Sequence, residues 1–231
     1  MDIGKSVTYF FQDKRWFSKL LIGWLVNLVP ILNFAFTGYV TETIRNVETN
    51  MEDPLPEWDG FGEKFVLGFF VWLAGIVYSI PLIILSIIFI IPAAVAGNEQ
   101  NSNAVTGILA GTTIVFACIA IIYALALTLF LPAMNINLAR KRTIGSVFEI
   151  GEFFRIFRVN TGNYLVAWIM SLVWGIVIGV IGGLLITFLL IIPCVGWIAA
   201  FIIGALMTVA IPLIYAHLFG QVAAKDTLAP A

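Results

Sequence analysis

The sequence predicts an all-α, polytopic transmembrane protein. Of its 231 residues, 61% are hydrophobic and 11% are charged, whereas soluble domains contain about 45–50% apolar and about 25% charged residues. The mean hydropathy is +1.04. Four apolar stretches exceed the roughly 20 residues that an α-helix needs to cross the hydrocarbon core of a bilayer. We therefore expect one membrane domain over residues 1–231.

The four predicted spanning helices cover residues 65–97, 104–138, 164–192 and 194–221. A polar loop joins the first two and contains no Lys or Arg. A tight turn with Pro193 and Gly196 joins the last two, and it also lacks cations. Such short connectors without cations are typical of hairpin tips. We expect both tips on the same side of the membrane.

The cations gather in the other connectors. Five of the twelve Lys and Arg residues lie in residues 139–162, and others precede or follow residues 16–43. Because loops rich in Lys and Arg stay in the cytoplasm, the 139–162 connector is predicted to be cytoplasmic. The loop 44–64 and the tail 222–231 then lie on that side too. The prediction is a multi-pass protein of the cell (cytoplasmic) membrane with a cytoplasmic C-terminus.

The first apolar stretch, residues 16–43, has two interpretations. Asn27, Pro30 and Asn33 interrupt it near its middle, and they leave two apolar halves that are each short for a bilayer crossing. A re-entrant hairpin would keep all twelve cations on one side, which the charge rule favours. A single helix with a proline kink, a fifth span, is the commoner arrangement, so both alternatives stay open.

Two amphipathic segments are predicted to lie in the headgroup region as interfacial helices. In residues 1–19, polar side chains recur along one helical face, namely Lys5, Thr8, Gln12, Arg15 and Lys19. In residues 139–162, Ser146 and Glu149 have the spacing of a capping box. The apolar residues that follow them share one face.

Chemical signatures are sparse. The four long stretches contain no Asp, Glu, Lys or Arg, and their one titratable imidazole, His217, lies near the end of the last stretch. Ionisable groups inside a membrane usually mark catalysis or ion coupling. No phosphate loop, nucleophile elbow or metal-ligand spacing occurs. We predict no enzyme activity, no catalytic residues, no cofactor, no metal and no nucleic-acid binding. Cys118 and Cys194 are expected to be free thiols.

Small residues recur at four-residue intervals on the last two stretches. The two sets are Gly175, Gly179 and Gly183, and Gly196, Ala200 and Gly204. Such stripes let helix backbones approach closely in a membrane. We expect the two helices to pack together through them. A seam in a homo-oligomer, or a path for water or a substrate, are the alternatives.

Two further groups are candidate sites. Asn135 and Asn137 follow Pro132, where the proline frees backbone carbonyls, and they are candidate ligand contacts. The loop before residue 65 combines acids and aromatics, and its candidate partner-docking residues are Glu57, Trp58, Asp59 and Phe61. The same residues could instead anchor at the headgroups and cap the next helix.

Several motifs resemble one known family. They are the opening Met1-Asp-Ile-Gly-Lys-Ser, Val29-Pro-Ile-Leu-Asn33, Gly38-Tyr39, Arg45-Asn46, Leu55-Pro-Glu-Trp-Asp59 with Phe61-Gly62, Phe148-Glu149 before Asn163-Tyr164, and His217-Leu-Phe-Gly-Gln221. In these the chain is similar to the prokaryotic membrane proteins called domain of unknown function 4013. The resemblance implies a polytopic protein of a prokaryotic cell membrane. It implies no activity and no site residues.

The expected function follows from the absence of catalytic chemistry and the abundance of packing surface. We expect a non-catalytic integral membrane protein that is an accessory or organising subunit of a membrane assembly. Its expected partners are membrane lipid and either a second copy or a partner membrane protein. The alternative is a facilitative transporter or pore for a neutral or apolar solute.

Overall fold

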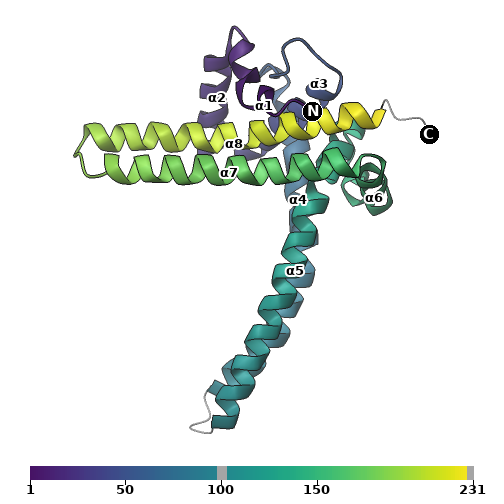
Figure 1. The fold of residues 1–231 in the computed structure, drawn as a ribbon, viewed down its shortest axis with the longest axis vertical. Coiled ribbons are helices and arrows are strands. Elements are labelled where there is room, and N and C mark those ends of the chain that lie inside the picture. The colour runs from purple at the N-terminus through teal and green to yellow at the C-terminus, as the bar shows by residue number, and fades with distance from the viewer. Residues whose placement is uncertain (98–102, 228–231) are drawn as a thin grey trace. The chain divides into compact units, whose positions relative to one another are not determined.

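The computed structural model describes residues 1–97 and 103–227, and over those ranges it contains helices and no strand (Figure 1). The helices follow in the order α1 (Lys5–Thr8), the 3-10 helix η1 (Tyr9–Gln12), α2 (Trp16–Leu28), α3 (Asn33–Glu48), α4 (Phe61–Gly97), α5 (Asn103–Lys141), the 3-10 helix η2 (Ile144–Phe148), α6 (Ile150–Val159), α7 (Thr161–Leu189) and α8 (Val195–Thr227). The all-α prediction is confirmed.

Four of the described helices are long and apolar enough to cross a membrane. The qualifying segments are Phe61–Phe89, Gly111–Lys141, Thr161–Leu189 and Val195–Asp226. They correspond to the four predicted spanning helices, so the chain is a multi-pass membrane protein. The predicted cation-free loop between the first two spans falls mainly on residues 98–102, which lie outside the described residues.

The chain forms two compact units. One comprises Met1–Trp72 with Pro132–Ala231, and the other comprises Leu73–Leu131. The second unit is an antiparallel helical hairpin, in which the Tyr123 hydroxyl donates to the Tyr78 carbonyl at 2.7 Å. Further along, the rings of Phe89 and Phe116 lie 5.5 Å apart. These two contacts pair residues at similar distances from the connection, as an antiparallel hairpin requires.

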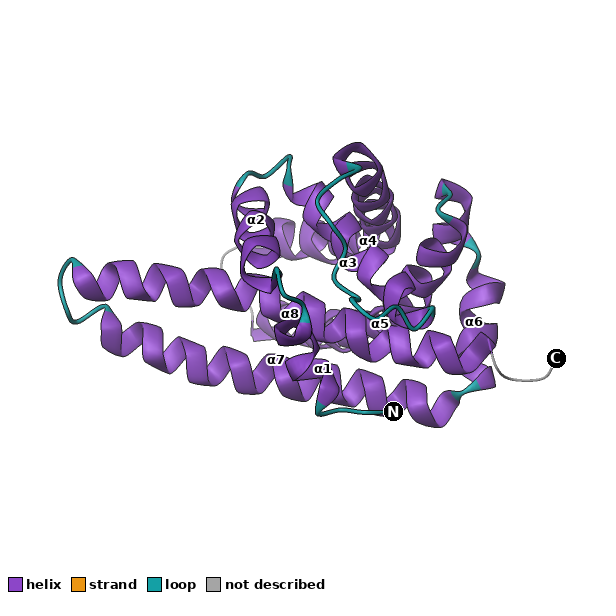
Figure 2. Ribbon diagram, turned by 90° about the horizontal axis from the view of Figure 1, so that it is seen from above, coloured by secondary structure: helices purple, strands orange, loops and turns teal. Residues whose placement is uncertain are grey.

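Helix α3 is the centre of the first unit. It packs against α2 and α8, and α8 in turn packs against α7 (Figure 2). Glycines permit its closest contacts, because a Cβ at Gly38 would overlap the backbone carbonyl of Lys64 and one at Gly68 would overlap that of Phe34. A Cβ at Gly220 of α8 would lie 2.5 Å from that of Val47. Backbones therefore meet almost directly where α3 crosses the start of α4 and the end of α8.

The first apolar stretch is two helices, α2 and α3, separated by residues 29–32 around Pro30. They pack against each other across this turn, and Gly23 of α2 faces the Phe36 ring of α3. The backbone therefore forms a helical hairpin, as one of the two interpretations predicted, and not one continuous kinked helix. Its insertion into the bilayer stays a prediction. The second half is also more polar than expected, since α3 contains Glu42 and continues to Glu48.

The predicted interfacial helix over residues 1–19 is wrong as a single element. The structure has α1, η1 and the start of α2 there, and Asp13 between them is extended, with ψ 126°. The Asp13 carboxylate accepts the Arg15 backbone N–H at 2.7 Å. Such a local side-chain bond competes with the helical hydrogen-bond pattern, and this accounts for the break.

The second interfacial segment is helical, but its predicted capping box does not form. Ser146 lies in η2, where its hydroxyl donates to the Thr143 carbonyl at 2.6 Å. Helix α6 begins only at Ile150. The Glu149 carboxylate accepts from Asn137 at 3.0 Å and pairs with Lys141. Because this carboxylate is engaged elsewhere, it does not reach back to the Ser146 backbone.

The crossing of α3 and α4 generates a stability prediction. Gly38→Ala is expected to destabilise the protein by about 1–3 kcal/mol or more, because the added methyl meets backbone and not a flexible side chain. Gly75→Ala is the matched control, since a Cβ there meets nothing within 4 Å. Thermal unfolding in detergent measures both. Equal midpoints for the two variants would contradict the proposed close crossing.

Candidate functional site

One arginine joins three helices at the polar end of the first unit. Arg140 of α5 donates through Nε to Glu48 of α3 and through Nη1 to Asp226 of α8, both at 2.7 Å. Its third nitrogen donates to the Ala223 carbonyl at 3.1 Å. The side chains of Glu48 and Asp226 are 7% and 2% exposed. Removing one partner from so buried a pair would leave an uncompensated charge in the interior.

A second buried cation, Lys19 of α2, lies beneath the loop that joins α3 and α4. Its ammonium contacts Asp13 at 2.5 Å and Glu57 at 2.9 Å, and it donates to the Leu55 carbonyl at 2.9 Å. The Trp58 indole N–H donates to the Lys19 carbonyl at 2.9 Å. These bonds attach the loop to α2 and satisfy the buried charge.

A third buried cation, Lys64, lies at the start of α4. Its ammonium is 3.0 Å from the Glu42 carboxylate of α3 and donates to the Asp59 carbonyl at 2.7 Å. The Lys64 and Arg140 pairs position α4, α5 and α8 around α3, and the Lys19 pairs attach α2 to its neighbouring loops. Each of these carboxylates must stay within a few ångströms of its cation, so it restricts the position of the helix that carries the cation.

The predicted docking residues divide into two groups. Glu57 and Trp58 turn inward, with the Trp58 ring stacked on Tyr39 at 4.5 Å between centroids. Asp59 and Phe61 are exposed, and Phe61 begins α4. A partner could therefore reach Asp59 and Phe61 directly, whereas Glu57 and Trp58 already have intramolecular roles.

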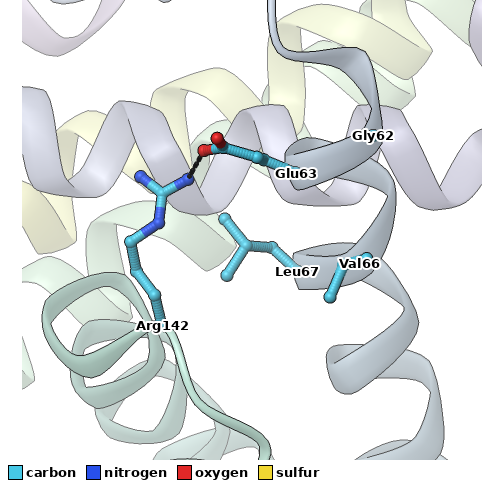
Figure 3. Close-up of a pocket in the computed structure, with 5 residues that line it drawn as sticks. All are labelled: Gly62, Glu63, Val66, Leu67 and Arg142. Carbon is cyan, nitrogen blue, oxygen red and sulfur yellow. Dashed lines mark hydrogen bonds and ion pairs between the residues drawn. The ribbon is translucent and has the colours of Figure 1, made fainter.

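A small pocket of about 310 Å³ lies on α4 near the end of α5. Figure 3 shows Arg142 facing Glu63 across it, with Leu67 below them. Arg142 Nη2 donates to Glu63 at 2.8 Å. The Glu63 side chain is 76% exposed, so the pair is largely solvated. The pocket offers no unpaired charge that would favour an ionic ligand.

The candidate ligand residues Asn135 and Asn137 are engaged within the fold. Asn135 donates to the Tyr215 hydroxyl at 2.9 Å, and Asn137 donates to the Ser146 carbonyl at 2.9 Å and to Glu149. The amide oxygen of each is buried without a hydrogen-bond partner. None of the described pockets opens onto either residue. Their role as ligand contacts stays a prediction.

The lone histidine is part of the core. His217 is 2% exposed and stacks on Tyr9 at 4.3 Å between centroids. Its Nδ1 lies 3.0 Å from the Gln221 amide nitrogen, and the Tyr9 hydroxyl donates to the Leu213 carbonyl at 3.1 Å. His217 thus helps hold the N-terminal segment on α8. Cys118 and Cys194 are free and exposed, as predicted.

The two stripes of small residues do not both lie at the contact between α7 and α8. A Cβ at Gly175, Gly179 or Gly183 would meet nothing within 4 Å, whereas one at Gly182 would overlap the Met207 side chain of α8. Of the second set, Gly196 approaches the Leu189 carbonyl at the turn and Ala200 is buried, whereas a Cβ at Gly204 would only just contact Ile186, at 3.9 Å. Helix α7 therefore meets α8 one residue away from its glycine stripe, and no described residue covers that stripe.

An apolar groove separates the N-terminal segment and α2 from α8. It has a volume of about 580 Å³. Five aromatic rings line one side, those of Phe10, Phe11, Trp16, Phe17 and Trp24. Ile202, Leu206 and Val209 of α8 are among the residues on the other side. A smaller pocket of about 400 Å³ shares Trp24 and Ala205 with it and contains Asn27 and Thr208.

Sequence reasoning missed the groove and the ion-pair centre. The groove needs α2 to cross α8, and no local pattern predicts that contact. The ion pairs had a readable signal, because Glu42, Arg45 and Glu48 follow an apolar run without a break in helical propensity. Such a pattern indicates a helix that leaves the apolar region and continues into polar surroundings.

The Asp13 carboxylate has a perturbed pKa. Burial by itself raises this pKa, but the hydrogen bonds from Lys19 and from the Arg15 backbone N–H, with their charges, hold it below its ordinary value. A carboxylate with a lowered folded-state pKa stabilises the fold above its unfolded-state pKa, and that contribution is lost as the pH falls through the folded-state pKa. The Glu149 pKa is also lowered, chiefly by Lys141 and then by Asn137.

The comparisons with known proteins give one match. A family model described as "Protein of unknown function (DUF4013)" matches residues 21–187. The matched range includes α3, α6 and most of α2 and α7, whereas the opening motif and the His217–Gln221 motif lie outside it. The searches of curated proteins and of solved structures returned no match.

Arg140→Gln is predicted to destabilise the protein by about 3–5 kcal/mol, because it leaves Glu48 buried without its cation and leaves Asp226 only its longer pair with Arg155 at 3.3 Å. Arg142→Gln is the control, since the solvated pair with Glu63 is worth about 1 kcal/mol or less. Denaturant unfolding in detergent compares them. Similar losses for both variants would show that Arg140 is not the joining residue.

Asp13→Asn is predicted to destabilise the protein at pH 7 and to have a smaller effect near pH 3. The ordinary pKa of an aspartate is about 3.9. The stabilisation that ionised Asp13 gives the wild-type protein is therefore fully present above that pH. It is lost as Asp13 in the folded protein is protonated. Thermal midpoints of both proteins across this pH range measure the difference. A constant difference down to pH 3 would contradict the ionic role of Asp13.

Proposed function

We propose, from the premise that the chain belongs to the family described as protein of unknown function DUF4013, that it is a non-catalytic organising subunit of a membrane assembly. One observation carries the proposal. Gly175, Gly179 and Gly183 form a stripe on α7 that is open, although α7 already packs against α8. A flat stripe on a lipid-facing helix lets another helix backbone approach closely.

The surroundings of the stripe support a helix as its occupant. Ile176 and Val180 beside it are 65% and 55% exposed, so the surface next to the glycines is apolar. In a bilayer, lipid covers such a face at no great cost, and association depends on close van der Waals packing. The partner is a second copy of this chain or another membrane protein.

We also propose the membrane in which the protein lies and the side on which its C-terminus lies. The protein resides in the cell membrane of a prokaryote, with its ion-paired helix ends and its C-terminus in the cytoplasm. Support comes from the charge distribution, because the connector with Arg140 and Arg158 is the richest in cations. Helix α6 there exposes Ile150 and Phe154 while burying Phe153, which suits a helix that contacts lipid headgroups or a partner.

A second candidate function is facilitated passage of a neutral or apolar solute. It is favoured by Pro81 inside α4 and Pro212 inside α8, because prolines permit helix bending. The rate of solute permeation into liposomes that contain the purified protein distinguishes the two functions. An organising subunit leaves solute permeation at the level of empty liposomes, and a transporter accelerates it.

Gly179→Leu is predicted to reduce association of the protein with its second copy or partner by roughly tenfold, which is about 1.4 kcal/mol. Gly162→Leu is the control, because it is on the same helix, off the stripe, and a Cβ there also meets nothing within 4 Å. Native mass spectrometry and crosslinking in isolated membranes measure the complexes.

The crosslinking experiment uses the variant Gly179→Cys in a chain that also carries Cys118→Ala and Cys194→Asn. Asparagine suits the second position because Cys194 has φ +62°. Disulfide-linked dimers identify a homo-oligomer, and a heavier adduct identifies a different partner. A protein that is always monomeric, with no adduct and no effect of Gly179→Leu, would refute the organising role.

A further inference from the structure

The groove between the N-terminal segment and α8 contains large apolar side chains that the chain itself leaves uncovered. Phe11, Phe17 and Leu206 are 56%, 61% and 50% exposed, while Phe10 beside them is 6% exposed and closes the floor. Consecutive rings contact one another, with centroids 4.5 Å apart for Phe10 and Phe11 and 5.0 Å for Phe11 and Trp16. The aromatic wall is therefore preformed.

The groove has the dimensions of a small-molecule site. Its volume of about 580 Å³ falls within the range of about 300–1,000 Å³ for ligand pockets. Trp16 and Trp24 mark its extent along α2. Trp24 follows Trp16 by eight positions on the helix, a rise of about 12 Å. An elongated, apolar occupant fits these walls better than a compact polar one.

Cations that directly precede the groove residue Trp16 in the sequence indicate the rest of the occupant. Lys14 and Arg15 immediately precede Trp16, and residues 1–19 hold four cations against two carboxylates. Arg15 pairs with Glu57 at 2.6 Å, and Lys19 is buried with Asp13 and Glu57. Lys14 is exposed and has no ion pair among the described residues. Its ammonium can therefore bind an anion.

We propose that this groove binds one anionic phospholipid, with an acyl chain against the aromatic wall and the headgroup phosphate at Lys14. A tryptophan at the charged end agrees with such a placement, because tryptophan prefers the level of the lipid headgroups. In a membrane the acyl chain gains little by leaving bulk lipid, so retention depends on close packing against the rings and on the charge of Lys14. The proposal is independent of the organising role.

The test is native mass spectrometry of the full chain released from vesicles of equal parts phosphatidylglycerol and phosphatidylcholine. The wild type is expected to retain one phosphatidylglycerol in preference to phosphatidylcholine. Leu206→Trp fills the groove and is expected to lower this retention roughly fivefold or more. Ile198→Trp is the matched control, since Ile198 is 62% exposed on the same helix but outside the groove.

The headgroup is tested separately. Lys14→Glu is expected to lower the preference for phosphatidylglycerol by about fivefold or more, since a basic residue near a lipid surface contributes about that factor. Arg45→Glu changes the net charge equally at an exposed position of α3 and should leave the preference unchanged. Phe17→Ala removes an exposed ring from the wall without adding bulk, and it should also lower retention.

Three results would overturn the proposal. They are equal retention of the two lipids by the wild type, unchanged retention in both Leu206→Trp and Phe17→Ala, and equal loss in the Ile198→Trp control. Thermal unfolding of each variant separates lost binding from lost folding. These outcomes are independent of the α7 crosslinking result, because the groove uses α2 and α8.

Discussion

Buried ion pairs around α3 are the constraint on which the first unit depends. A carboxylate removed from water costs several kcal/mol unless a cation compensates it. Glu42 and Glu48 of α3 are compensated by Lys64 of α4 and Arg140 of α5. These cations come from the ends of long apolar helices, so each pair fixes where an apolar helix meets the polar part of the protein.

The glycines at the same crossings serve the ion pairs. Gly38 and Gly68 allow α3 and α4 to approach at backbone distance, and Gly220 does the same between α3 and α8. A larger residue would separate the helices and lengthen the ionic contacts. Close packing and charge compensation therefore depend on one another here. The open stripe on α7 has no such intrachain use, which is why it supports a partner helix.

The N-terminal segment links this centre to the apolar groove. Asp13 breaks the helix, pairs with Lys19 and so directs α2 away from η1. That change of direction places Phe11 and Trp16 on one wall, opposite α8. The tertiary contacts of His217 and Tyr9 hold the segment against α8. An aromatic wall next to exposed Lys14 is the result, and it is the basis of the proposed lipid site.

The sequence by itself determined the helical membrane class, the four spans and the break at Pro30, because apolar length and proline act locally. It predicted a continuous helix over residues 1–19 and a cap at Ser146. Both were wrong, because Asp13 accepts from the Arg15 backbone and from Lys19, and Glu149 binds Asn137 and Lys141 and not the Ser146 backbone. Only the tertiary structure decided that Glu57 and Trp58 turn inward, that Gly182 and not its neighbours meets α8, and that Arg140 joins three helices. Each of these depends on which helices cross, and crossing is set by complementary surfaces far apart in the chain.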